Sequence, residues 1–235
     1  MNSMVFIISA PSGSGKSTLV SELRKSVANL YFSISYTTRS PRGSEQNGRE
    51  YYFVPREEFE RMRDADEFLE HADVFGNYYG TARRFLREAQ THGHDLLLDI
   101  DVQGAAQIKA KMPEAVSIFI LPPSRDELER RLVRRSHAEG VTSDDVIQRR
   151  LHTASREIEN WSKYDYILVN DRLEESIDQL KAIVLCEREI HAAGPVQNGV
   201  HCKTAAPCRK ENARERVLAI RASFIGDHAG ASEKN

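Results

Sequence analysis

Hydrophobic residues along this chain gather in short runs, and stretches of helical periodicity separate the runs. The runs lie at residues 5–9, 32–35, 51–54, 96–100, 117–120 and 166–169. Most of them are nearly unbroken, which is typical of strands buried on both faces of a parallel sheet. Between the runs, apolar residues recur at helical spacing, as in Leu19, Leu23 and Val27, in Ile147, Leu151, Ala154 and Ile158, and in Leu173, Ile177, Leu180 and Val184. This alternation predicts an α/β fold in which helices flank a parallel sheet.

Two segments depart from the alternation. Residues 36–79 hold polar turns around the short run at 51–54 and a helical pattern near 57–63, which predicts an inserted α+β lobe. Residues 134–145 are polar and charged and lie between two helical patterns, which predicts a mobile flap. We therefore expect one domain over residues 1–190, with the lobe at about 36–81 and a helical lid at about 134–150.

The end of the chain has a different character. Residues 192–212 mix Gly, Pro, Asn and Lys with almost no apolar periodicity, and only residues 213–224 have the pattern of a short helix. Segments of this kind bury too little apolar surface to hold a fixed structure. A loosely attached tail is expected over residues 191–235.

Composition narrows the class of protein. The chain has 235 residues, of which 40% are hydrophobic and 29% charged, which fits one core-bearing domain with an appendage and excludes a fibrous protein. No window approaches the roughly 18 apolar residues of a membrane span, and the start lacks the basic segment of a secretory signal. A net charge of −2 gives no general attraction to nucleic acid. We expect neither a nucleic-acid nor a membrane partner, and the oligomeric state stays open.

The cysteines bear on the compartment. Cys186, Cys202 and Cys208 are an odd number and form no CxxC pair, which suits a reducing compartment better than a disulfide framework. A cytoplasmic protein is therefore expected. His201 lies close to the last two cysteines, but the spacing matches no standard zinc site.

A glycine-rich loop follows the first apolar run directly. Its residues are Ala10, Pro11, Ser12, Gly13, Ser14, Gly15, Lys16, Ser17 and Thr18. A strand, a glycine loop, Lys-Ser-Thr and a helix follow one another in the order that a P-loop requires, although Ala10 stands where the first glycine is usual. Gly13 and Gly15 let successive N–H groups turn toward phosphate oxygens, and the start of the helix adds positive charge.

The remaining polar side chains of this loop predict a site for a nucleoside triphosphate. Lys16 would reach the β and γ phosphates, and the Ser17 hydroxyl would ligate Mg²⁺. The alternative is a simple Gly/Ser-rich turn, which has no need of Lys16. A P-loop does not identify the acceptor of the phosphoryl group.

Seven further stretches of the sequence closely resemble the guanylate kinase family. They read SISYTTRSPR (33–42), NGREYYFV (47–54), FLEH (68–71), FGNYYGT (75–81), LDIDVQG (98–104), FILPPS (119–124) and YDYILVND (164–171). The resemblance covers roughly residues 4–190. It implies a P-loop NTPase core, a GMP-binding lobe and a lid, with Mg²⁺-dependent transfer of a phosphoryl group from ATP to GMP, giving ADP and GDP.

The resemblance also implies roles for individual residues of the lobe. The GMP phosphate would be held by Arg39, Arg42, Tyr51 and Tyr79, and the guanine base by Ser35, Glu70 and Thr81, with Asp101 nearby. The chemistry is consistent, because a dianion needs several donors and because guanine offers adjacent N–H donors to a carboxylate. Adenine lacks this donor pair, so a buried Glu70 would reject AMP. Taken singly, each residue would be assigned to solvated surface or packing.

Arginines of the lid and the ends of two strands complete the expected site. The resemblance points to Arg135 and Arg150 as catalytic lid arginines, with Lys16 and Arg39 assisting. The family's usual Arg-Gly-Arg-Gly reads Arg134-Arg135-Ser136 here, so Arg134 is an alternative to Arg135. Asn170 would approach the adenine of ATP. Asp99 would lie in the outer shell of Mg²⁺, or would serve as a helix cap or turn residue.

Two rival functions follow from the same features. One is a related kinase that phosphorylates a ribose bisphosphate, which would give Glu70 and Ser35 no base to bind. The other is an interaction module of guanylate kinase type that binds phosphopeptides without catalysis. Such modules typically have a degraded P-loop, whereas Gly15, Lys16 and Ser17 are present in this chain.

Overall fold

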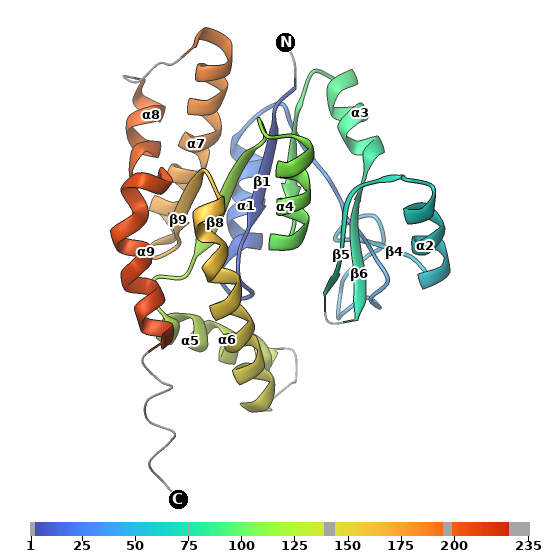
Figure 1. The fold of residues 1–235 in the computed structure, drawn as a ribbon, viewed down its shortest axis with the longest axis horizontal. Helices are drawn as coiled ribbons and strands as arrows, with labels where there is room; N and C mark the ends of the chain where they lie inside the picture. The colour runs from blue at the N-terminus through green and yellow to red at the C-terminus, as the bar shows by residue number, and fades with distance from the viewer. Residues whose placement is uncertain (1–2, 75, 139–143, 195–198, 226–235) are drawn as a thin grey trace, which may run out of the picture. The chain divides into compact units, whose positions relative to one another are not determined.

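The computed structural model describes residues 3–74, 76–138, 144–194 and 199–225. The chain forms two compact units, which are interleaved along the sequence (Figure 1). The first comprises Met1–Ser9 and Val27–Ser117, and the second comprises Ala10–Ser26 and Ile118–Asn235. Among the described residues, no helix has the length and apolar character needed to cross a membrane.

Three parallel strands form the core of the first unit. Their order is β2 (Leu30–Phe32), β7 (Asp95–Asp99) and β1 (Val5–Ser9). All five residues of β1 are buried, because helices cover both faces of parallel strands. Helix α3 (Arg83–Thr91) packs on β7, and α4 (Val102–Lys111) packs on β1. The predicted parallel sheet with flanking helices is confirmed here.

A second sheet belongs to the same unit. Its strands follow the order β4 (Tyr52–Phe53), β3 (Tyr36–Thr37), β6 (Asn77–Ala82) and β5 (Phe68–Val74). The pairs β3–β6 and β5–β6 are antiparallel, and β3–β4 is parallel. Helix α2 (Arg56–Asp64) packs on β5, where the ring of Phe59 stacks on that of Phe68 at 4.5 Å. This α+β arrangement lies within the stretch where the sequence predicts an inserted lobe.

The second unit contains the remaining helices and two further parallel strands. Strand β8 (Val116–Leu121) pairs with β9 (Tyr166–Val169) from Ile118 to Leu121. Helix α1 (Lys16–Ser26) packs on α7 (Leu173–Ala193), and α5 (Arg125–Ala138) packs on α6 (Asp144–Ile158). A short 3-10 helix, η1 (Glu159–Lys163), follows α6.

The flap expected over residues 134–145 takes another form in its described part. Residues 134–138 continue α5, and α6 begins at Asp144, so both flanks are helical. The centre of the predicted flap, residues 139–143, lies outside the described part of the chain.

Contrary to the sequence-based expectation, residues 199–225 are not a loose tail. They form α8 (Val200–Ala205), the 3-10 helix η2 (Ala206–Cys208) and α9 (Lys210–Ile225). One face of α9 is buried, through Ala213, Val217, Ile220 and Phe224. This face packs on α5, α6 and β9, so the few apolar residues of the segment are enough to anchor it. Residues 195–198 and 226–235 lie outside the described part.

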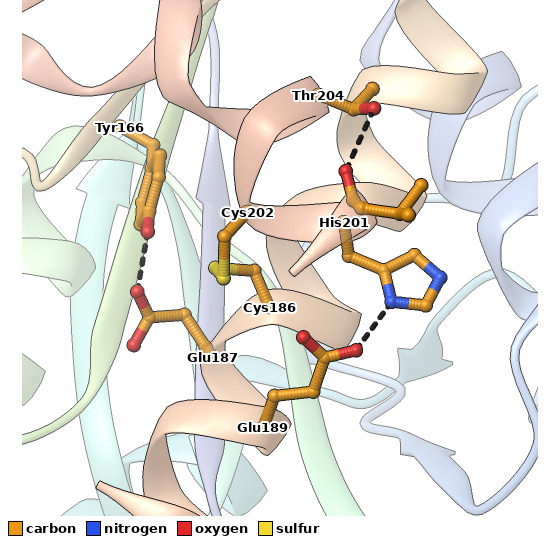
Figure 2. Close-up of a disulfide and its surroundings, with 8 residues drawn as sticks. Tyr166, Cys186, Glu187, Glu189, His201, Cys202 and Thr204 are labelled. Carbon is orange, nitrogen blue, oxygen red and sulfur yellow. Dashed lines mark hydrogen bonds and ion pairs between the residues drawn. A yellow bond between two sulfur atoms is a disulfide. The ribbon is translucent and has the colours of Figure 1, made fainter. Parts of the chain in front are cut away.

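A disulfide ties this segment to the preceding helix, as Figure 2 shows. It joins Cys186 of α7 to Cys202 of α8 across a sequence separation of 16 residues. The cysteine count disfavoured a disulfide framework, yet two of the three cysteines form a disulfide. Cys208 is free and buried, and burial raises the pKa of its thiol to about 12. An odd number of cysteines does not reveal which two will be brought together in the fold.

Candidate active site

A buried acid marks a candidate binding region of the first unit, within the sheet of the lobe. Glu70 on β5 faces Thr81 on β6 in the strand register, and the Thr81 hydroxyl donates to Glu70 Oε1 at 2.6 Å. Only 3% of Glu70 is exposed. Burial raises the pKa of its carboxyl to about 7, with Asp101 adding to the rise and the Thr81 hydrogen bond opposing it.

The start of α4 leaves space for this carboxylate. Asp101 caps the helix by accepting the Gly104 N–H at 2.8 Å. A Cβ at position 104 would lie 2.3 Å from Glu70 Oε2, so only glycine fits there with Glu70 in place. The structure thus brings together three of the predicted residues, Glu70, Thr81 and Asp101, and adds Gly104. The role of Gly104 was not predicted, because its need for space depends on a strand far away in the sequence.

An arginine and two tyrosines form a second cluster in the same unit. Arg39 is 8% exposed, and its Nε donates to the Tyr79 hydroxyl at 3.2 Å. The Arg39 guanidinium lies 5.3 Å from the centre of the Tyr51 ring, and the Tyr51 and Tyr79 rings meet edge to face. These three predicted phosphate-binding residues are therefore close together.

Glu45 completes the cluster and was not predicted. Arg39 donates to both Glu45 carboxylate oxygens, at 2.9 and 3.0 Å, and the Arg42 backbone N–H donates to Glu45 at 2.8 Å. Burial alone would raise the pKa of Glu45, but these hydrogen bonds outweigh it and hold the pKa below its usual value. Arg42 itself is exposed, and so differs from Arg39 in its surroundings. Ser35 is 8% exposed, and its backbone carbonyl accepts the Tyr52 N–H at 2.9 Å.

The glycine loop forms a separate candidate binding region, in the second unit. Gly13 and Gly15 have φ values of 91° and 88°, which side chains with a Cβ rarely adopt. The Ser14 N–H donates to the Pro11 carbonyl at 3.1 Å, which closes a tight turn. Helix α1 begins at Lys16, so its N-terminal N–H groups lie at the end of the loop.

Asn170 and Arg131 hold this loop through hydrogen bonds. The Asn170 side-chain amide donates to the Ser14 carbonyl at 2.8 Å, and Asn170 is 5% exposed. Arg131 of α5 donates to the Asn170 carbonyl at 3.0 Å and to the Ser14 carbonyl at 3.4 Å. A Cβ at Gly15 would lie 2.3 Å from Asn170 Nδ2. Asn170 therefore has a structural contact with the loop, and its expected approach to adenine stays a prediction.

The donor set of the loop fits Mg²⁺ carried by a nucleotide. Among the described residues, no group of three or more His, Cys, Asp or Glu side chains is placed to hold a metal. Mg²⁺ usually takes few ligands from the protein and the rest from phosphate and water. Ser17, exposed in the first turn of α1, can supply such a ligand. Asp99 ends β7 and is half-buried.

The predicted lid arginines lie on two packed helices. Arg134 and Arg135 are both exposed on α5, and Arg150 is half-buried on α6. Arg131, on the same helix as Arg135, is the arginine that contacts the loop, and the sequence did not single it out. Arg131 forms an ion pair at 2.8 Å with Glu127, four residues earlier on the helix. This i,i+4 spacing is the feature of the sequence that could have indicated how Arg131 is oriented.

Comparisons with known proteins decide the family. The guanylate kinase family model matches residues 2–187. The chain belongs to the guanylate kinase family. A guanylate kinase of Koribacter versatilis is 60% identical over 226 residues, covering 95% of this chain and 97% of that protein. One from Shewanella sp. strain MR-7 is 48% identical over 200 residues, covering 83% and 95%.

A solved structure agrees with this family assignment. The crystal structure of guanylate kinase from Anaplasma phagocytophilum matches with a TM-score of 0.65 and 34% identity, covering 92% of this chain and 94% of that one. The resemblance found in the sequence motifs is thereby confirmed, and so is the α/β fold class.

Proposed function

We propose that this chain is an ATP:GMP phosphotransferase, which transfers the γ-phosphoryl group of ATP to GMP and gives ADP and GDP. Membership of the guanylate kinase family supports the reaction. The observation that carries the choice of GMP is the buried Glu70 carboxyl, bonded to Thr81 and accommodated by Gly104.

Guanine supplies what this buried acid lacks. Its N1–H and N2–H₂ groups are adjacent donors, and a carboxylate accepts two hydrogen bonds side by side. Adenine would offer the buried Glu70 carboxylate no such pair of donors and would leave it only its contact with Thr81, at a cost of about 1–3 kcal/mol or more for a charged group. Glu70 therefore selects GMP over AMP, with Thr81, Ser35 and Asp101 completing the base site.

Arginine and tyrosine side chains bind the phosphate of GMP. Arg39, Arg42, Tyr51 and Tyr79 supply N–H and O–H donors to the dianion. The Tyr79 hydroxyl already accepts a hydrogen bond from Arg39 at 3.2 Å, which supports a shared role of the two side chains in phosphate binding. Glu45 holds the same guanidinium and so keeps a buried cation compensated.

The donor nucleotide binds at the loop of residues 10–18. Backbone N–H groups of the loop enclose the phosphates, Lys16 reaches the β and γ phosphates, and Ser17 holds Mg²⁺. When bound, Mg²⁺ neutralises charge on the phosphate oxygens. Arg135 and Arg150 add positive charge for the transferring group, and Arg134 remains the alternative to Arg135.

No general base is required in this mechanism. The phosphate of GMP is already an anion near neutral pH, so the residues need only align the reactants and stabilise charge.

The substrates are small molecules, and we propose a cytoplasmic location without a nucleic-acid or membrane partner. The Cys186–Cys202 disulfide does not belong to the donor or acceptor residues, and both cysteines are at most 5% exposed.

A coupled assay of ADP release tests the proposal. We expect turnover with GMP and much lower turnover with AMP, CMP and UMP at equal concentration. A Glu70→Gln variant, which keeps the size of the side chain but not its charge, should lose most of the preference for GMP. Equal rates with all four acceptors would rule the proposal out. ATP binding without turnover would instead favour the interaction-module alternative.

A further inference from the structure

The ATP loop is held by residues that belong to other elements of the second unit. A Cβ at Gly13 would lie 2.9 Å from side-chain atoms of both Leu128 and Leu132, which lie on α5. The Ser14 carbonyl accepts hydrogen bonds from Arg131 and Asn170. The position of α5 therefore sets the shape of the space in which the loop lies.

Helix α9 packs on those same elements, as Figure 1 shows for its end beside α5. Its buried face contacts α5, α6 and β9, the strand that ends one residue before Asn170. At its C-terminal end, the Ser223 hydroxyl accepts the backbone N–H of Arg125, the first residue of α5, at 3.1 Å. Ser124 accepts the N–H of Glu127 in the same turn, so two N–H groups of α5 are capped, one of them from α9.

Two ion pairs join α9 to further points of the second unit. Arg216 donates to Asp171, the neighbour of Asn170, at 3.2 Å. Arg221 donates to both carboxylate oxygens of Glu159 in η1. Because these pairs are largely exposed, they add little stability.

We propose that α9 is a positioning element of the ATP site, with Phe224 and Ser223 as its positioning residues. Phe224 is 6% exposed and follows the residue that caps α5. The helix lies beyond residue 187, where the match to the family model ends, so it is an addition to the part that the family model describes. The proposal rests on the proposed function only for the identity of the ligand at the loop.

A matched pair of Phe→Leu substitutions tests this role. Phe224→Leu alters α9, whereas Phe85→Leu alters a helix of the first unit at a residue that is 3% exposed. Binding of a non-hydrolysable ATP analogue with Mg²⁺ is measured by calorimetry without GMP, together with the melting temperature. We expect Phe224→Leu to weaken analogue binding about fivefold, equivalent to about 1 kcal/mol, and Phe85→Leu to leave it within error. Leu218→Ala, on the exposed side of α9, should also leave it unchanged.

Steady-state kinetics add a second readout that a purely structural role would not change. With Phe224→Leu, KM for ATP should rise while KM for GMP stays constant. Equal changes in both KM values, or equal loss of analogue binding in the Phe224 and Phe85 variants, would overturn the proposal. So would unchanged binding in Phe224→Leu.

Two substitutions of Ser223 test the proposal if the Phe224→Leu variant does not fold. Ser223→Ala should then weaken analogue binding about twofold, and Ser223→Thr should restore it, since threonine keeps the acceptor oxygen. Wild-type binding by Ser223→Ala would overturn the proposal. If the unaltered protein binds the analogue but does not phosphorylate GMP, the proposed function fails while this inference stands.

Discussion

At the scale of single residues, burial makes Glu70 sensitive to pH near neutrality. The pKa of its carboxyl is raised to about 7 by burial, with Asp101 raising it and Lys111 and Thr81 lowering it. Guanine donors bind the carboxylate and not the neutral acid, so GMP binding requires loss of this proton. The affinity for GMP must therefore fall as the pH falls below about 7.

We expect KM for GMP to be about tenfold higher at pH 6 than at pH 8, as for a single group of this pKa. KM for ATP, measured over the same range, serves as the control. In Glu70→Gln the amide does not titrate, and KM for GMP should be high at both values. A flat profile in the unaltered protein would show that Glu70 is already ionised at pH 6.

Gly104 allows a second prediction at this scale. In Gly104→Ala the new Cβ would lie 2.3 Å from Glu70 Oε2, so the carboxylate must move. We expect KM for GMP to rise by about tenfold or more, which corresponds to about 1.4 kcal/mol. The melting temperature should change little, because alanine favours a helix over glycine by up to about 1 kcal/mol and offsets part of the strain.

Ala106→Gly is the matched control for that substitution. Ala106 is exposed on the same helix, so this change should lower stability and leave KM for GMP unaltered. If Gly104→Ala bound GMP normally, the close approach of the helix and Glu70 would have no role in specificity.

The extent to which the sequence predicts a site residue also differs from residue to residue. Motifs indicated Arg39, Glu70 and Thr81, and the structure brings each of them into contact with another polar group of the lobe. Glu45 and Gly104 were missed because their importance depends on which side chain lies opposite, and no spacing along the chain encodes that. The assigned roles of all these residues remain predictions until variants are measured.

At the scale of elements, buried strands were the most predictable feature. β1, β7 and β9 were expected from unbroken apolar runs, since a strand covered on both faces has no polar side to interrupt the pattern. The strand expected at 32–35 is instead Leu30–Phe32, and beyond it only the Ser33 N–H continues the pairing, to the Leu97 carbonyl at 3.1 Å. Ser33 and Ser35 are both buried and lie two residues apart, which is the spacing of one face of a strand, so the pattern alone could not locate the end of β2.

The loose attachment predicted for residues 199–225 was wrong because a tertiary crosslink and one narrow apolar face hold them, whereas the helical pattern at 213–224 agrees with α9. The Cys186–Cys202 bond joins α7 to α8 and closes a loop with a sequence separation of 16. Closing a loop of about 15 residues removes about 3 kcal/mol of chain entropy from the unfolded state in the entropic model. Neither feature produces a periodic signal over residues 192–212.

We therefore expect reduction to destabilise this part of the molecule. Dithiothreitol should lower the melting temperature, and Cys202→Ser should lower it by a similar amount and remove the response to dithiothreitol. Cys208→Ser is the control, because this thiol is free and its loss should leave the response intact. A melting temperature independent of reductant would mean that the crosslink adds no stability.

At the scale of the whole molecule, the residues proposed to bind the two nucleotides lie in different units. The GMP residues from Ser35 to Asp101 belong to the first, and the loop, Asn170 and the lid arginines belong to the second. A substitution in one unit should therefore affect the binding of one nucleotide without affecting that of the other. The sequence motifs predicted both halves, but not that residues 10–26 belong to a unit different from that of the strand before them.

Lys16→Ala tests this separation. Loss of the ammonium group that contacts the ATP phosphates should reduce kcat by at least about a hundredfold. GMP binding, measured by calorimetry without ATP, should stay within about twofold of the unaltered protein. Lys25→Ala, an exposed lysine on the same helix, should retain full activity. Loss of GMP binding in Lys16→Ala would contradict the division into donor and acceptor residues.

The interleaving of the units has a consequence for translation. A nascent chain that has emerged as far as Ser117 contains every residue of the first unit, including β1 and its partner β7. It also contains the glycine loop, but not Leu128, Leu132 or Asn170, against which Gly13 and Gly15 pack. During synthesis, all residues of the acceptor lobe are therefore present before the loop of residues 10–18 has the neighbours that shape it.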